Sequence, residues 1–299
     1  MFSILLAFGS CLIFIIAYFT YGRFLARRIF SLSDNNITPA VALRDDQDYV
    51  PSNVEVLFGH HFTSIAGTGP IVGPAIAVIW GWLPALLWIV IGSVVIGAVH
   101  DFGALVLSLR HQGKSIGDVC AQVINPRVRI LFLVLIALAL LIVLAVFCLV
   151  MAVLFTMYPQ AVIPVWFQIP IAMVIGQLVY RRGMKPLPLS LIGVMLVYAC
   201  IVIGAYVPLA MPQIGPFSPL TLWTIVLLGY CAVASILPVW RLLQPRDYLN
   251  GHQLFVVLGL LALGILVSRP EIVAPVVSHH VNDAPPILPF LFITIACGA

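Results

Sequence analysis

The sequence predicts an all-α, polytopic transmembrane helical bundle, and three observations lead to that prediction. Hydrophobic residues make up 63% of the chain and charged residues only 8%, whereas roughly a quarter of the residues in a soluble domain are charged. Apolar runs of about 20 residues, each long enough to cross a bilayer as a helix, recur along the whole chain. These runs are continuously apolar rather than alternating, which favours helices over the strands of a membrane barrel.

Eight complete spans and a partial ninth can be drawn within what we expect to be a single transmembrane domain, residues 1–299. The predicted spans are 3–22, 57–80, 84–109, 130–157, 162–180, 188–210, 220–240 and 252–268. The ninth apolar run begins near Pro286 and is still apolar at Ala299.

The basic residues divide sharply between the two sets of alternate loops. Every lysine and arginine except Arg269 falls in a loop that follows an odd-numbered span. Basic loops stay on the cytoplasmic side during insertion. The division therefore predicts an external N-terminus, a cytoplasmic loop at 23–56 and an external loop at 269–285.

The second predicted span carries its own helix breakers at mid-depth, in the stretch Gly67-Thr68-Gly69-Pro70. An interrupted helix survives in hydrocarbon only against protein or a water-lined cavity, where its freed backbone groups can meet a substrate or an ion. The alternative is a kinked packing helix whose glycines allow close helix approach. We expect a site, and the candidate substrate- or ion-binding residues are His61, Thr63, Ser64, Gly67, Thr68, Gly69, Pro70, Gly73 and, from the ninth run, Thr294.

A short echo of this span appears at the other end of the chain. The stretch FTSIA (Phe62 to Ala66) resembles FITIA (Phe292 to Ala296), and small residues follow both. Because they lie in the second and the ninth span, an odd number of spans apart, the two stretches run in opposite directions through the membrane. Paired, interrupted helices of opposite direction are typical of secondary transporters built from inverted repeats, so we expect that type of bundle with a discontinuous helix.

One carboxylate, Asp101, lies well inside a predicted span, beside His100. Charges at such depth are costly and usually face the bundle interior, a partner or water. We expect these two residues to couple transport to an ion. The alternative for Asp101 is a structural acid near the cytoplasmic interface, hydrogen-bonded to Ser108 or to a neighbouring helix. His60 and His61 fall near the start of the second span, where they either bind protons or substrate or simply mark the interface.

Several classes of function lack their motifs in this sequence. No phosphate-binding loop of the form GxxxxGK[ST], no HExxH motif, and no His/Cys set with metal-ligand spacing occurs. We therefore expect no enzyme, no cofactor, no metal site and no nucleic-acid partner. A membrane redox or haem protein using His60, His61 and His100 is the enzyme-class alternative.

Four stretches carry a family resemblance: VLFGHHFTSIAGTGPIVGP (Val56 to Pro74), GAVHDF (Gly97 to Phe102), QPRDYLN (Gln244 to Asn250) and PFLFITIACGA (Pro289 to Ala299). In order and spacing the chain resembles the carbon starvation protein A (CstA) family of bacterial inner-membrane transporters. The resemblance implies a multi-pass carrier that takes up peptides or pyruvate during carbon starvation, with protons or sodium as the coupling ion. Two features depart from the family pattern. His100 stands where members usually have glutamine, and members are roughly twice as long.

The function that we expect is secondary active transport of small organic acids or peptides across the lipid bilayer of the bacterial inner membrane. The chain stops inside the ninth helix, so we expect it to be the N-terminal half of such a transporter. That half would be functional with a separate C-terminal partner, or it would be a non-transporting remnant.

Overall fold

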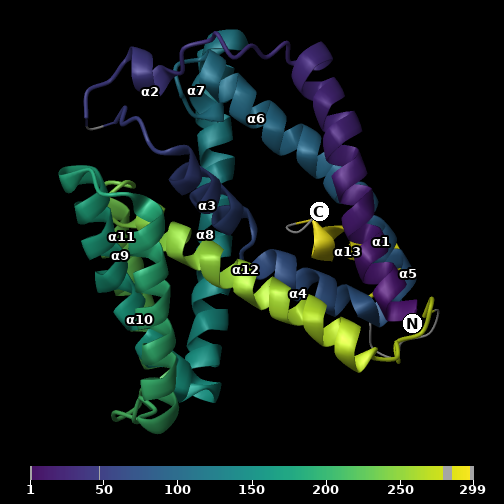
Figure 1. Ribbon diagram of the computed structural model, residues 1–299, viewed down its shortest axis with the longest axis vertical. Coiled ribbons are helices and arrows are strands. Elements are labelled where there is room, and N and C mark those ends of the chain that lie inside the picture. Colours follow the sequence, from purple (N-terminus) through teal and green to yellow (C-terminus); the bar gives the residue numbers. More distant parts are fainter. Residues whose placement is uncertain (1, 47, 279–284, 297–299) are drawn as a thin grey trace. The chain divides into compact units, whose positions relative to one another are not determined.

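The computed structural model describes residues 2–46, 48–278 and 285–296, and its long elements there are all helices (Figure 1). They are α1 (Phe2–Ala17), α2 (Pro39–Ala42), α3 (Val54–Ile65), α4 (Thr68–Ala77), α5 (Trp82–Gly92), α6 (Ala98–Arg110), α7 (Ile116–Val123), α8 (Pro126–Met157), α9 (Val162–Arg182), α10 (Pro186–Tyr206), α11 (Pro219–Ile236), α12 (Leu243–Ser268) and α13 (Ile287–Ile295). Turns of π-helix at Tyr18–Gly22, Leu25–Ile29 and Ser93–Gly97 and of 3₁₀-helix at Val78–Trp80 and Pro159–Ala161 extend several of them.

Within the described residues, 8 helical segments are long and apolar enough to cross a membrane. They are Phe2–Ile29, Val54–Trp80, Trp82–Arg110, Pro126–Met157, Pro159–Arg182, Pro186–Tyr206, Pro219–Ile236 and Leu243–Ser268. The predicted multi-pass helical bundle is confirmed. The largest difference is at the last segment, which begins at Leu243 rather than at the predicted residue 252.

Local sequence explains where several helices start and stop. α10 and α11 begin at Pro186 and Pro219, a position where the missing proline N–H has no helical partner to lose. The Ser218 hydroxyl also accepts a hydrogen bond from the Thr221 N–H and so caps α11. α9 ends directly before Gly183, whose φ of 64° is the left-handed conformation that terminates a helix.

The chain forms two compact units, which we describe separately. The first unit comprises residues 1–45, 65–125 and 257–299, and the second comprises residues 46–64 and 126–256. α3 therefore lies in the second unit except for its last residue, and α4 lies in the first.

In the first unit, α4 and α5 pack against α13. The buried core there consists of Ala77, Trp80, Ala85, Leu291 and Ile295. The turn between α4 and α5 is fixed by the segment before α13, because the N–H groups of Trp82 and Leu83 donate to the carbonyls of Pro275 and Val276.

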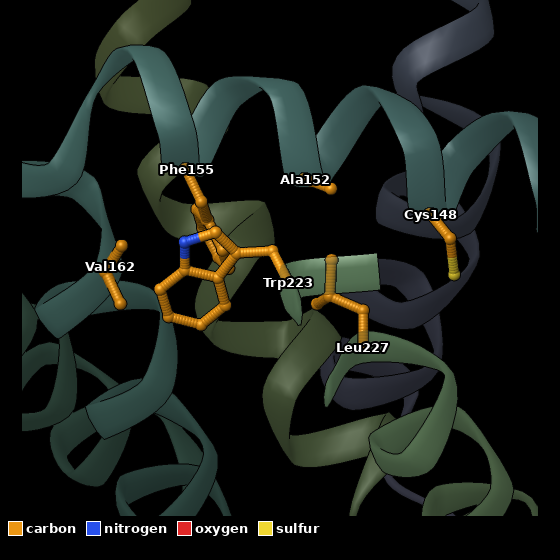
Figure 2. Close-up of a cluster of buried hydrophobic side chains, with 6 residues drawn as sticks. All are labelled: Cys148, Ala152, Phe155, Val162, Trp223 and Leu227. Carbon is orange, nitrogen blue, oxygen red and sulfur yellow. The ribbon is translucent and has the colours of Figure 1, made fainter. Parts of the chain in front are cut away.

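In the second unit, α8 packs against α11 and α9 against α10. Figure 2 shows the side chains that fill the first of these contacts, with the Trp223 ring beside Phe155. The cluster comprises Cys148, Ala152, Phe155, Val162, Trp223 and Leu227. A second cluster joins the start of α12 to α9 and α10, because the buried side chain of Leu249 contacts Ala172, Ile175 and Val194. The first turns of α12 are thus held within this unit.

Candidate functional site

The second membrane segment is interrupted, as predicted. α3 ends at Ile65 and α4 begins at Thr68, so Ala66 and Gly67 lie outside both helices. Gly67 has an extended backbone, with φ −81° and ψ −165°, and its N–H donates to the Ile65 carbonyl over 2.8 Å. The first N–H groups of α4 have no acceptors inside their own helix, so the positive end of α4 faces the break.

The break lies slightly earlier than the sequence suggests. Thr68, Gly69 and Pro70 already belong to α4, and a proline in the first helical turn loses no hydrogen bond. The second proline of this helix, Pro74, does have a consequence. The N–H of residue 74 would be the helical donor to the Pro70 carbonyl, and proline has none. The carbonyl of Pro70 is therefore free of its usual helical bond, within the first unit and close to the break.

Gly73 and Thr294, two of the predicted site residues, meet inside the first unit. Gly73 is buried against α13, and a Cβ added to it would clash with the carbonyl oxygen of Thr294. This is the close-packing role of a glycine, which was the alternative explanation for the glycines of this span. Gly67 differs, because a Cβ there would meet nothing within 4 Å.

Of the three predicted site residues before the break, one contacts α12 and two are exposed. The Thr63 hydroxyl donates to the main-chain carbonyl of Asp247 over 2.8 Å. His61 and Ser64 are both exposed. Of the three, only Thr63 is thus drawn into the packing of α3 against α12.

A buried ionic cluster lies beside Thr63, and the sequence did not predict it. His60 Nδ1 lies 2.8 Å from Asp247 Oδ2, and the two side chains are 27% and 8% exposed. Arg246 donates from Nε and Nη2 to Asp247 Oδ1 over 3.3 Å and 3.2 Å, and from Nη1 to the Tyr230 hydroxyl over 3.2 Å. A buried carboxylate is tolerated only when it is paired in this way.

Two glycines allow this cluster to form. A Cβ on Gly59 would lie 2.6 Å from Cδ2 of Tyr248, and a Cβ on Gly251 would lie 3.4 Å from the Thr63 hydroxyl oxygen. Because neither glycine has a side chain, α3 and α12 approach closely, as membrane helices do at small residues. The approach brings His60 and Thr63, one helical turn apart, onto Asp247.

The other predicted pair, His100 and Asp101, lies in the first turn of α6, directly after the π-helical turn Ser93–Gly97. His100 Nδ1 lies 2.9 Å from Asp101 Oδ1, and the side chains are 79% and 52% exposed. The Ser108 hydroxyl donates instead to the carbonyl of Lys114. The pair thus forms a local contact on one helix.

Within the described residues, no group of three or more His, Cys, Asp and Glu side chains could hold a metal ion. His60, one of the histidines of the haem alternative, has its Nδ1 against Asp247. The structure therefore offers no specific observation in favour of haem.

Comparison with known proteins matches the chain to one family and to several transporters. The family model described as "Carbon starvation protein CstA" matches residues 2–299. The chain is 38% identical over 301 residues to "Peptide transporter CstA" of Escherichia coli (strain K12), covering 97% of this chain and 42% of the relative. It is also 38% identical over 302 residues to "Pyruvate/proton symporter BtsT" of the same organism, with the same two coverages of 97% and 42%.

A third relative, "Peptide transporter CstA" of Bacillus subtilis (strain 168), is 38% identical over 312 residues, covering 99% of this chain and 50% of the relative. The chain thus spans about two fifths to one half of the length of these relatives. No solved structure matches the chain.

Proposed function

The chain belongs to the carbon starvation protein CstA family, and we propose that it acts in secondary active transport of small organic acids such as pyruvate, or of peptides. The observation that carries this proposal is the interruption at Ala66 and Gly67 inside an apolar membrane segment. Backbone groups that lack helical partners in hydrocarbon are costly unless something replaces those partners. A substrate or coupling ion in the transport cycle is such a replacement.

The proposed substrate- and ion-binding residues flank the break along the chain. His61, Thr63 and Ser64 precede it, and Gly67, Thr68, Gly69 and Pro70 form it or follow it. The carbonyl of Pro70 supports cation binding, because it has no N–H donor four residues on. Gly73 and Thr294 support the same site by packing α4 against α13.

For the coupling ion, the proposal is a proton, with sodium as the second candidate. The name of one relative, a pyruvate/proton symporter, favours the proton. Asp101 with His100 is the proposed coupling pair, because a carboxylate and an imidazole in contact can exchange a proton over 2.9 Å. The proposed location is the bacterial inner membrane with an external N-terminus, because all basic residues but Arg269 then lie toward the cytoplasmic ends of the predicted spans.

Transport is proposed in place of an enzymatic reaction, since the relatives carry the names of transporters. The relatives are about twice as long as this chain or longer. A separate C-terminal half is therefore a proposed partner. Co-expression with the matching C-terminal part of a relative, followed by co-purification, tests that partnership.

The function itself is tested by uptake of labelled pyruvate and labelled dialanine into proteoliposomes under an imposed pH or sodium gradient. Gly69→Leu should abolish uptake by filling the start of α4, and Asp101→Asn should remove the dependence of uptake on the gradient. Unchanged, gradient-driven uptake in both variants would contradict the proposed site.

A further inference from the structure

We propose that the cluster of His60, Asp247 and Arg246 binds one proton and one substrate carboxylate together, the proton on His60 and the carboxylate on Arg246. This inference rests on the proposed function and names the groups by which it would recognise an acid. It places the proton that binds together with the acid on His60, whereas the role proposed for His100 and Asp101 is the response of transport to the gradient. All three residues lie in the second unit, so the argument uses contacts within one body.

Among the described residues, one ring nitrogen of His60 has a hydrogen-bond partner and the other has none. Nδ1 lies 2.8 Å from Asp247 Oδ2, and an ionised carboxylate only accepts hydrogen bonds, so Nδ1 carries the hydrogen in neutral His60. Nε2 then holds a lone pair and is the atom on which a further proton binds. Asp247 stabilises the resulting imidazolium, because the two groups are in direct contact.

Within the described part of the chain, two N–H groups of Arg246 have no hydrogen-bond partner and remain for a ligand. A guanidinium carries five N–H donors. The Nε–H and one N–H of Nη2 donate to Asp247, and one N–H of Nη1 donates to the Tyr230 hydroxyl. The remaining two, one on each Nη, are the number that a carboxylate accepts in a bidentate pair. The Arg246 side chain is 29% exposed, so it is not sealed inside the unit.

The charge balance links the two binding events. With neutral His60, the opposite charges of Arg246 and Asp247 cancel, and an added carboxylate would leave the cluster with a net negative charge. A proton on His60 gives the cluster one positive charge, which the carboxylate neutralises. Net charge is costly at low dielectric, so each ligand strengthens the binding of the other, and by linkage the effect is reciprocal.

Among the residues that the structure describes, few other titratable groups adjoin His60 and its partner Asp247. On α12, Asp247 contacts His60 directly, Arg246 is bonded to Asp247, and Tyr248 lies against the neighbouring Gly59. On α11, Tyr230 is connected through its hydrogen bond with Arg246. On α3 itself, Glu55 lies more than one turn before His60 and interacts with Tyr248. The charge that responds to a proton in this cluster is therefore that of the imidazole.

The proposal is tested by isothermal titration calorimetry on the purified full chain in lipid nanodiscs, with pyruvate and dialanine as probes. Titrations in two buffers of different ionisation enthalpy count the protons that bind with each ligand. Uptake of about one proton per carboxylate is expected, with Kd rising about tenfold per pH unit where the free site loses its proton. Pyruvamide and the C-terminal amide of dialanine, which both lack the carboxylate, should not bind, and the acid with the lower Kd identifies the substrate class.

Variants separate the roles. His60→Gln should remove the proton uptake, whereas His111→Gln, at a partly exposed histidine of the first unit, should leave it unchanged. Arg246→Lys keeps the positive charge but removes the planar guanidinium that can bind a carboxylate with two hydrogen bonds. It should therefore raise Kd at least about tenfold while proton uptake persists. If His60→Gln fails to fold, as judged by its circular dichroism melting curve, the Arg246→Lys result and the wild-type proton count still decide.

Binding without proton uptake, or proton uptake that Asp101→Asn abolishes and His60→Gln does not, would overturn the proposal. Absence of binding by either acid at every pH would also overturn it. Gradient-driven uptake in proteoliposomes would then still support transport. Conversely, proton-linked binding without uptake would leave the cluster standing and count against the proposed function.

Discussion

The imidazole of His60 and the carboxylate of Asp247 lie 2.8 Å apart although 187 positions separate them in the chain. The contact joins α3, immediately before the break in the second membrane segment, to the first turns of α12. The helix that precedes the break is thereby hydrogen-bonded to a buried carboxylate. Gly59 allows this contact, because its missing side chain lets α3 and α12 approach closely.

Gly59→Ala should destabilise the second unit. The added Cβ would lie 2.6 Å from Cδ2 and 3.2 Å from Cα of Tyr248, and relieving such overpacking costs about 1–3 kcal/mol. Thermal unfolding in detergent, followed by circular dichroism, should show a lower midpoint. Gly229→Ala on α11 is the matched control, because a Cβ there meets nothing within 4 Å. Equal midpoints for the two variants would contradict the close approach of α3 and α12.

Asp247→Asn should also destabilise the protein, because it leaves Arg246 partly buried without its counter-charge. Removing one partner of a buried ion pair costs about 3–5 kcal/mol, and partial exposure of Arg246 reduces this to about 1–3 kcal/mol. Asp101→Asn, at a side chain that is 52% exposed, should leave the unfolding midpoint nearly unchanged. Urea denaturation of both variants measures the difference. A larger loss at Asp101 would reverse the assignment of the structural carboxylate.

The two glycines of the interrupted segment should respond oppositely to a methyl group. Gly73→Ala forces the added Cβ against the Thr294 carbonyl and should loosen α13 from α4. Gly67→Ala should be tolerated, since its φ of −81° suits any residue and the space around it is open. Limited proteolysis at the C-terminal segment reports the first effect. If Gly67→Ala loosens α13 as much as Gly73→Ala does, the packing of α4 is not as described.

Hydropathy and proline–glycine punctuation predicted the membrane segments and the interruption of the second one. These features depend on local sequence, because every backbone group in a bilayer must be bonded within its own helix. The break was predicted at Gly67 to Pro70 and lies at Ala66 and Gly67, since Pro70 occupies the first turn of α4, where proline is tolerated.

The ionic cluster could not be predicted in the same way. The stretch QPRDYLN has charged residues and was assigned to a loop, which placed the start of the last span at residue 252. In the structure it forms the first turns of α12, where Asp247 is hydrogen-bonded to His60 and its charge is balanced by Arg246. Such pairing depends on long-range contact. The available signal was the combination of a charged, proline-containing stretch with Gly251 directly before an apolar run.

The most direct measurement of the role of the break is substrate protection of a cysteine at position 67. In a background without the 6 native cysteines, Gly67→Cys adds a thiol where a Cβ meets nothing within 4 Å, and Gly259→Cys on α12 is the control with equally open space. Labelling by a small water-soluble thiol reagent is expected at Cys-substituted Gly67 and should slow at least about tenfold with saturating pyruvate or dialanine, whereas Gly259→Cys should show no protection. Rapid labelling of Gly67→Cys that neither acid slows would contradict a substrate site at the break.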